Sequence, residues 1–230
     1  KILVVEDDIS LKDSLVRLLQ NRDFLVQAVE NKQQAVEQIK SGQQYDIYLL
    51  DVWLPDGNGF DICHEIRKIS QAIVMFLTSC DDEESITKGL DIGGDDYITK
   101  PFNPLELVAR VKSQLRRYTQ LGNMNQQAEG QVYKCGGLQI NDDNKEVTVD
   151  GDPIKLTPIE YNILLLLVKN AGKVFSIDEI YEKIWNEEAI GADNTVAVHI
   201  RHIREKIEIN PREPKYLKVV WGVGYKIEKQ

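Results

Sequence analysis

The chain has 230 residues, enough for one large or two ordinary domains. Its composition, 42% hydrophobic and 28% charged, is typical of a soluble globular protein, and no apolar run is long enough to cross a bilayer, which argues against a membrane-spanning helix. The net charge of −9 argues against binding to nucleic acid, but binding patches are local, so the total charge does not decide the matter.

The first half of the chain alternates between apolar strands and amphipathic helices. Short apolar runs predict strands at residues 2–5, 24–29, 46–50, 73–77 and 97–98. Apolar residues at helical spacing predict helices at residues 11–19, 35–39, 60–66 and 105–115, and a polar helix is expected at residues 82–90. Five such units in alternation favour an α/β domain over residues 1–118, with a doubly wound, five-stranded parallel sheet of the flavodoxin-like kind.

The composition changes at residues 119–130, where Gln, Asn and Gly predominate and little can be buried. This stretch is predicted to be a flexible linker. Beyond it, short β segments around turns are expected at residues 138–140 and 145–149. A second domain is therefore expected over residues 131–230.

Three helices and a terminal hairpin are predicted in this second domain. The first helix starts at Thr157-Pro158-Ile159-Glu160, with Pro at the first helical position and an acid in the first turn. Further helices are expected at residues 176–185 and 193–208. Residues 216–227 alternate around Gly222-Val223-Gly224 and predict a β-hairpin. This order of elements resembles an α+β winged helix-turn-helix.

Chemistry-bearing residues gather at the ends of the predicted strands of the first domain. Glu6, Asp7 and Asp51 end the first and third strands, which are neighbours in a doubly wound sheet, so their carboxylates are expected to converge. Such a cluster is costly without compensation, and Mg²⁺, which takes oxygen ligands, would resolve it. Thr78 and Lys100 end the fourth and fifth strands and could hold the oxygens of a phosphoryl group on Asp51. Each residue alone is more often a cap or a solvated charge.

Four motifs of the first half resemble the signature of response-regulator receiver domains. They are Val4-Val5-Glu6-Asp7-Asp8, Leu50-Asp51-Val52-Trp53-Leu54-Pro55-Asp56-Gly57, Leu77-Thr78 and Asp95-Asp96-Tyr97-Ile98-Thr99-Lys100-Pro101-Phe102. The second half resembles the winged-helix effector of the OmpR/PhoB family. The ending Val220-Trp221-Gly222-Val223-Gly224-Tyr225-Lys226-Ile227 and residues 110–117 are similar to the VanR-like branch associated with glycopeptide resistance.

The resemblance implies roles for the strand-end residues. Asp51 would accept the phosphoryl group from a sensor histidine kinase. Mg²⁺ would be bound by Asp7, Asp51 and the Trp53 backbone carbonyl, with Glu6 acting through water. Thr78 and Tyr97 would form a switch pair, and Lys100 would precede a cis Pro101. Tyr97 could equally be an ordinary half-buried aromatic residue.

The predicted helix at residues 193–208 is a candidate DNA-reading element. Its apolar stripe is Val196, Ile200, Ile203 and Ile207, and the opposite face carries Asn194, Val198, Arg201, His202 and Glu205. A solvated face is the plain alternative, but an Arg- and His-bearing face can enter a major groove. By resemblance, Arg201 and His202 face bases, His199 and Arg204 lie near phosphates, and the hairpin reaches the minor groove. Trp221 stands at the hairpin tip, where many relatives have Arg.

The resemblance also implies partners. A homodimer would form on phosphorylation through the fourth helix, fifth strand and fifth helix, with charges from Asp95, Asp96, Glu106, Arg110 and Arg117. Ile86 stands where relatives carry a Lys or Arg. The second half holds more acidic than basic residues, so we expect modest monomer affinity for double-stranded promoter DNA, compensated by dimer binding to repeated half-sites. RNA polymerase would be the further partner of a transcription factor.

Cysteine usage and the start of the chain favour a cytoplasmic location. Cys63, Cys80 and Cys135 are odd in number and lack CxxC spacing, which argues against a disulfide framework or a zinc site and suits a reducing compartment. The chain becomes acidic at Glu6-Asp7-Asp8, unlike a signal peptide.

Two rival functions remain to be weighed. A phosphatase with an Asp nucleophile usually has a second Asp two residues later, and Trp53 occupies that place, so no enzyme is predicted. A DNA-binding regulator with phosphorylation-independent control is the other, and the complete acidic site argues against it. Trp53 and Cys80, two residues beyond Asp51 and Thr78, cannot orient a water molecule as a carboxylate or amide would, which predicts a long-lived phosphorylated state.

Overall fold

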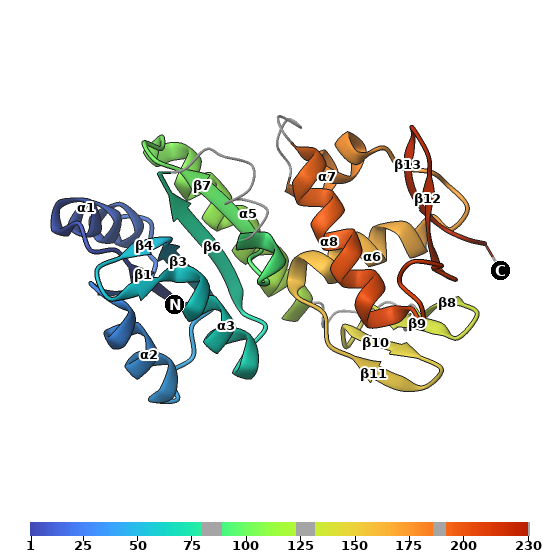
Figure 1. Cartoon of the computed structure of the whole chain (residues 1–230), viewed down its shortest axis with the longest axis horizontal. Helices are drawn as coiled ribbons and strands as arrows, with labels where there is room; N and C mark the ends of the chain where they lie inside the picture. Colours follow the sequence, from blue (N-terminus) through green and yellow to red (C-terminus); the bar gives the residue numbers. More distant parts are fainter. Residues whose placement is uncertain (80–88, 123–131, 186–191, 230) are drawn as a thin grey trace. The chain divides into compact units, whose positions relative to one another are not determined.

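The computed structural model describes residues 1–79, 89–122, 132–185 and 192–229, without the side chains of residues 116–122 and 192–193. The chain divides into two compact units, Lys1–Leu115 and Arg116–Gln230. The first unit runs from blue to green in Figure 1 and the second from green to red. Each unit has its own hydrophobic core.

A five-stranded parallel sheet forms the centre of the first unit. Its strands, in spatial order, are β2 Val26–Val29, β1 Ile2–Val5, β3 Ile47–Asp51, β6 Ile73–Thr78 and β7 Asp96–Thr99. Because all pairs are parallel, the carboxyl ends of the strands meet at one edge. The predicted doubly wound α/β fold is confirmed.

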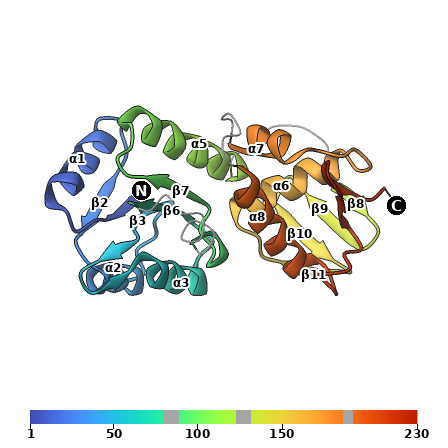
Figure 2. The same ribbon diagram turned by 45° about the horizontal axis from the view of Figure 1, so that its top comes forward.

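Helices cover both faces of this sheet. Figure 2 shows α1 Ile9–Gln20 and α5 Pro104–Gly122 on one face, and α2 Lys32–Lys40 and α3 Gly59–Ile69 on the other. Double coverage explains why β1 is apolar at every position and fully buried, since neither face of the strand meets water. The helix predicted at residues 82–90 lies mostly outside the described residues.

Side-chain caps define where the helices of the first unit begin. Asp8 accepts a hydrogen bond from the Leu11 backbone N–H at 2.9 Å, and Asn31 and Asn58 cap α2 and α3 in the same way. The cap at Asp8 follows directly on β1, so α1 starts at the edge where the strands end. The edge therefore carries turns and helix starts, which leave room for a polar site.

The second unit combines a four-stranded antiparallel sheet with three helices and a hairpin. The sheet has the order β11 Asp152–Ile154, β10 Glu146–Val149, β9 Leu138–Asn141 and β8 Val132–Cys135. The helices are α6 Pro158–Lys169, α7 Ile177–Trp185 and α8 Ala192–Ile207, and the hairpin joins β12 Leu217–Val220 to β13 Gly224–Ile227. The predicted winged helix-turn-helix is confirmed.

The α6 start forms the capping box expected from its sequence. The Thr157 backbone N–H donates to Glu160 Oε2 at 2.8 Å, and the Glu160 N–H donates to Thr157 Oγ1 at 3.4 Å. The helix is apolar on most of its surface because α7, α8 and the β8–β11 sheet pack around it. It is therefore the central element of the second core.

Some details differ from the sequence-based expectations. Helix α5 continues to Gly122, four residues into the stretch predicted as linker, and residues 123–131 lie outside the described part. Strands β8 and β11 were not predicted, because each is short and only partly apolar. A small hairpin, β4 Trp53–Leu54 with β5 Gly57–Asn58, occupies the turn after β3.

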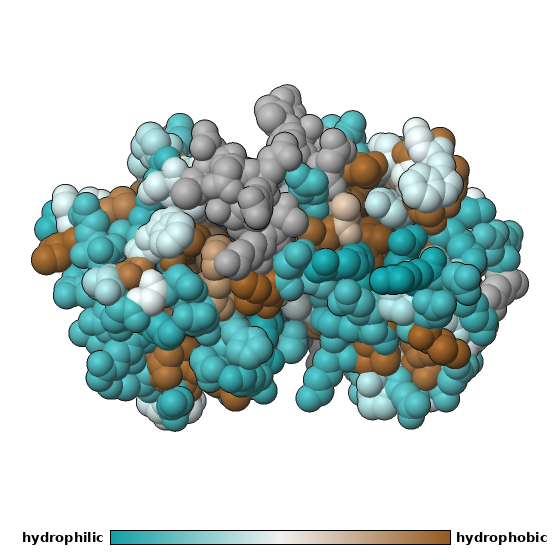
Figure 3. Space-filling model, in the orientation of Figure 1, coloured by the Kyte–Doolittle hydropathy of each residue, from teal (hydrophilic) through white to brown (hydrophobic). Residues whose placement is uncertain are grey.

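The visible surface is predominantly hydrophilic, with separate hydrophobic patches (Figure 3). Within the ranges that the structure describes, no helix combines the length and hydropathy that crossing a bilayer requires.

Candidate functional site

Three carboxylates converge at the carboxyl edge of the first sheet, as the sequence predicts. One oxygen each of Glu6, Asp7 and Asp51 lies within 4.8 Å of the others. Glu6 and Asp51 are 1% and 5% exposed, whereas Asp7 is exposed to solvent. Parallel pairing of β1 with β3 brings them together, since Val5 lies opposite Leu50. An oxygen-only donor set that is open on one side fits Mg²⁺, which keeps several of its waters.

Lys100 compensates the two buried carboxylates. Its Nζ donates to Glu6 Oε2 at 2.7 Å and to Asp51 Oδ2 at 2.8 Å. The residue follows β7, and the Lys100–Pro101 peptide bond is cis, as the resemblance implies. The Lys100 backbone N–H donates to the Thr78 carbonyl at 2.6 Å, so both residues belong to the same edge. Thr78 itself is 3% exposed at the end of β6.

Burial and charge shift the protonation of this cluster. Burial, together with the nearby Asp51 charge, raises the pKa of Glu6 to about 7, although the Lys100 hydrogen bond opposes the shift. Burial alone lowers the pKa of Lys100, but its hydrogen bonds to Asp51 and Glu6 outweigh burial and raise that pKa. Lys100 therefore stays charged, while Glu6 titrates near neutrality in the metal-free site.

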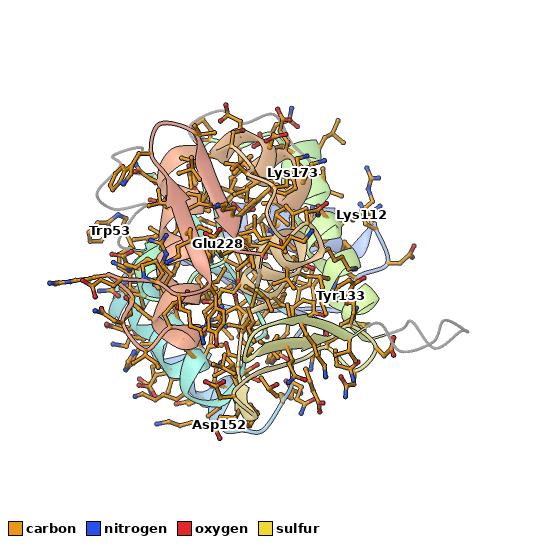
Figure 4. The ribbon with its side chains drawn as sticks, turned by 90° about the vertical axis from the view of Figure 1, so that its right-hand side faces the viewer. Trp53, Lys112, Tyr133, Asp152, Lys173 and Glu228 are labelled. Atoms are coloured by element: carbon orange, nitrogen blue, oxygen red, sulfur yellow. The ribbon has the colours of Figure 1, made fainter. Side chains whose placement is uncertain are left out.

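The turn after β3 is held close to Asp51. The Trp53 backbone N–H donates to Asp51 Oδ1 at 3.1 Å, and a side chain at Gly59 would meet the Asp51 carbonyl at 2.3 Å. Trp53 is 58% exposed, and its indole stands out from the ribbon in Figure 4. Tyr97 lies in β7 opposite Phe76 and is half-buried against the core. Cys80 lies outside the described residues.

Asp56 has a role that the sequence reading missed. Its carboxylate accepts the backbone N–H groups of Lys32 and Gln33, both at 2.8 Å, and so caps the start of α2 from the turn after β3. The Lys32 side chain lies against Gly57 and donates to Asp61 at 2.7 Å. The Pro55-Asp56-Gly57 turn was the only signal, and it could not show which helix the acid would reach.

The residues predicted for the dimer face divide into buried and surface groups. Asp95, predicted to supply a charge to the dimer face, is fully buried in this conformation: it accepts Arg67 Nη2 at 2.6 Å and the Val74 N–H at 2.9 Å. Asp96 is 2% exposed and pairs with Arg110 at 3.3 Å within the same chain. Arg110 also bonds Glu106 at 3.2 Å. The Arg117 side chain and Ile86 lie outside the described part.

The predicted DNA-reading face of α8 is narrower than expected. Asn194 and Arg201 are exposed, but Val198, His199 and His202 are 7%, 1% and 9% exposed, so in this conformation these three do not offer an accessible contact surface. The helix is buried on a second side as well as along its apolar stripe, because both neighbouring helices pack against it.

Particular contacts account for the buried histidines. The His199 ring lies 5.6 Å from the Trp185 ring of α7, measured between centroids. His202 Nδ1 lies 3.9 Å from Glu160 Oε1 of α6, which also accepts Lys206 Nζ at 2.8 Å. Burial lowers the pKa of His202 from its ordinary value. The Glu160 charge opposes this shift, but burial outweighs it and favours an uncharged packing role for His202.

The turn between β12 and β13 presents apolar side chains to solvent. Trp221 is 88% and Val223 is 55% exposed. Gly222 has φ +72°, a left-handed conformation that glycine adopts without strain. A hollow of about 440 Å³ lies between this turn and the start of α7, lined by residues from Ser176 to Asp178 and from Val219 to Tyr225.

The fold and the acidic edge are those of a response regulator, in which a receiver domain is joined to a winged-helix transcription-regulator domain. Residues 2–112 match the response regulator receiver domain family, and residues 151–227 match the family described as transcriptional regulatory protein, C terminal. The chain belongs to the OmpR/PhoB family of response regulators.

Relatives of this chain are similar over its whole length. The regulatory protein VanR of Enterococcus faecium is 42% identical over 230 residues, which covers 100% of this chain and 99% of VanR. VanRc of Enterococcus gallinarum is 41% identical, again over 100% of this chain and 99% of the relative. The crystal structure of DrrB, a Thermotoga maritima OmpR/PhoB homolog, is 35% identical, with a TM-score of 0.52 and coverage of 99% and 98%.

Proposed function

We propose that Asp51 is the phosphoryl acceptor of this response regulator and that a sensor histidine kinase is the donor. A carboxylate oxygen of Asp51 attacks the phosphorus in line, a P–O bond forms, and the P–N bond to the kinase histidine breaks. The observation that carries this proposal is the convergence of Glu6, Asp7 and Asp51 at one sheet edge, where Lys100 bonds both Glu6 and Asp51. Most of the work at such a site is positioning and charge neutralisation.

The remaining residues of the edge would hold the phosphoryl group and its metal. Asp7, Asp51 and the Trp53 carbonyl would bind Mg²⁺, with Glu6 in contact through water, and the ion would supply neutralisation of the phosphoryl oxygens. Lys100 already lies 2.8 Å from Asp51 Oδ2, so it is placed to pair with an oxygen of the new group. The Thr78 hydroxyl and Tyr97, on adjacent strands, would carry the signal outward.

In the second unit, Asn194 and Arg201 of α8 and Trp221 of the hairpin would contact promoter DNA. These are the exposed members of the predicted set. The phosphorylated chain would act as a homodimer on repeated half-sites and recruit RNA polymerase. Dimerisation would compensate the weak electrostatic attraction of an acidic protein to DNA.

One experiment tests acceptor and output together. The chain is incubated with Mg²⁺ and acetyl phosphate, and intact mass and DNA affinity are measured on the same samples. Wild type should gain one phosphoryl group and bind DNA more tightly, and Asp51→Asn should do neither. Asp8→Asn is the matched control, because Asn also caps a helix. A full phosphoryl adduct on Asp51→Asn contradicts the acceptor assignment, and equal DNA affinity with and without phosphate supports phosphorylation-independent control.

A further inference from the structure

Arg204 connects helix α8 to both strands of the terminal hairpin. Its Nε donates to the Leu217 carbonyl of β12 at 3.0 Å. Its guanidinium carbon lies 5.8 Å from the centre of the Tyr225 ring in β13. One side chain of α8 therefore contacts the first residue of β12 and the second residue of β13.

The strand that Arg204 reaches is itself anchored. The Tyr225 backbone exchanges two hydrogen bonds of 2.9 Å with Phe175, just before α7. Gly224 lies so close to Phe175 that an added Cβ would come within 1.9 Å of the Phe175 carbonyl oxygen. Val220 pairs with Gly224, so the anchored strand also fixes the turn at residues 221–223 between them. The position of the turn relative to α8 depends on this chain of contacts.

Arg204 is poorly placed to serve as a phosphate contact. Its Nη2 is buried and, among the residues described, finds no hydrogen-bond partner. Burial also lowers the pKa of the guanidinium. Arg201, one turn earlier on the same helix, has a side chain that is 48% exposed. The two arginines thus differ in accessibility although they carry the same charge.

We propose that Arg204 is a positioning residue for DNA recognition, which sets the place of the Trp221 turn relative to α8 and does not itself contact the DNA backbone. The inference rests on the proposed DNA-binding role of α8 and the hairpin. It departs from the family resemblance, which puts Arg204 near phosphates.

A double-mutant cycle with Trp221 distinguishes positioning of the turn by Arg204 from direct contact of Arg204 with the DNA backbone. The probe is a duplex selected by the phosphorylated full-length chain from a random pool, and affinity is measured at several salt concentrations. Arg204→Ala and Arg204→Lys should each lower affinity about tenfold, because a lysine cannot donate to Leu217 and cover the Tyr225 ring together. In a Trp221→Ala background, either change should lower DNA affinity by less than about twofold, because the Trp221 contact that Arg204 positions is already lost.

Salt dependence supplies the second readout. Loss of one phosphate contact lowers the slope of log affinity against log salt by about 0.9. Arg204→Ala should leave the slope unchanged, since the turn that it displaces has no charged side chain. Arg201→Ala is the matched control. It should lower the slope, and its loss of affinity should be additive with that of Trp221→Ala.

Full affinity in Arg204→Lys, a lower slope in Arg204→Ala, or additivity with Trp221→Ala would each overturn the proposal. If Arg204→Ala does not fold, Arg204→Lys and Tyr225→Leu, which removes the ring beneath the guanidinium, give the same test. Absence of DNA binding by wild type would instead overturn the proposed function together with this inference.

Discussion

At the scale of single residues, Glu6 is subject to opposing demands. Its carboxylate must be ionised to serve a metal site, yet it is 1% exposed and shares Lys100 with Asp51. Burial is the main reason why the pKa of Glu6 rises to about 7; the hydrogen bond from Lys100 opposes this shift without cancelling it, and the Asp51 charge adds to it. In the metal-free protein the site is therefore partly protonated at neutral pH.

This shift predicts a pH-dependent stability of the first unit. The pKa of Glu6 rises from its usual 4.5 to about 7 on folding, so between these values the folded state holds more protons than the unfolded state. The free energy of unfolding should fall as pH rises from about 4.5 to about 7. Thermal melting in EDTA should show this decline in wild type and a flatter profile in Glu6→Gln.

Magnesium supplies the control for this prediction. Metal binds the ionised carboxylates, so adding Mg²⁺ should raise the melting temperature most at the alkaline end of the range. Parallel melting profiles for wild type and Glu6→Gln would show that Glu6 does not titrate in this window.

The presence of Trp53 two residues beyond Asp51 predicts slow loss of the phosphoryl group. The indole is 58% exposed, and it can neither orient nor deprotonate an attacking water. Trp53→Asn should shorten the lifetime of the phosphorylated state by about 10²-fold, the lower range of general acid–base assistance. The measurement is the decay of the phosphorylated mass in Mg²⁺ after removal of the donor.

Two outcomes would contradict the argument about Trp53: loss of phosphate within seconds in wild type, or an unchanged lifetime in Trp53→Asn. Trp53→Phe serves as the control, because it keeps a bulky apolar ring and should keep the long lifetime.

At the scale of elements, α6 organises the second unit through its first turn. Glu160 is 2% exposed, closes the capping box with Thr157 and accepts Lys206 from α8 at 2.6 Å. A helix start and a contact between helices thus share one buried carboxylate. The charge is compensated on both sides, by a backbone N–H and by an ammonium.

Removal of the cap should destabilise the second unit. Thr157→Ala leaves the Glu160 N–H without its side-chain acceptor and should lower the free energy of unfolding by about 1 kcal/mol. Urea unfolding can be followed by the fluorescence of Trp185, which is 2% exposed, whereas Trp53 and Trp221 are already exposed in the folded state. Ser41→Ala, in the first unit, is the control. An unchanged urea midpoint for Thr157→Ala would show that the cap does not stabilise the second unit.

At the scale of the whole molecule, the proposed function couples phosphorylation to dimerisation. The face predicted for dimerisation is already paired internally, because Arg110 bonds both Asp96 and Glu106 of its own chain. A dimer through this face would have to exchange or share these ion pairs. Leu105 on α5, with 65% of its surface accessible, would add an apolar contact to such a dimer.

Phosphorylated wild type should therefore sediment as a dimer, and Arg110→Ala should dimerise more weakly, by roughly tenfold, because each interface contains the residue twice. Lys68→Ala, on α3, is the control, since its surface pair with Glu65 lies on the opposite helical layer. Equal dimerisation by wild type and Arg110→Ala would place the interface elsewhere.

The sequence by itself determined the fold class and the acidic site of this protein. Apolar runs and helical spacing carry the alternation of elements, and residues at strand ends must converge because parallel strands finish at one edge. Glu6, Asp7, Asp51 and Lys100 could thus be named without coordinates. The capping residues Thr157 and Glu160 were also readable, because a cap depends only on neighbours in the chain.

Only the tertiary structure decided which polar residues are accessible. A helix surface predicted from one apolar stripe leaves Val198 and His202 outside, and the resemblance adds His199, but all three are buried in the folded unit. Asp95 was predicted for the dimer face, and Arg67, a partner distant in the sequence, bonds its buried carboxylate. Arg204 likewise acquires its place from Leu217 and Tyr225. Such contacts depend on how separate elements pack together, and periodicity along one element carries no information about them.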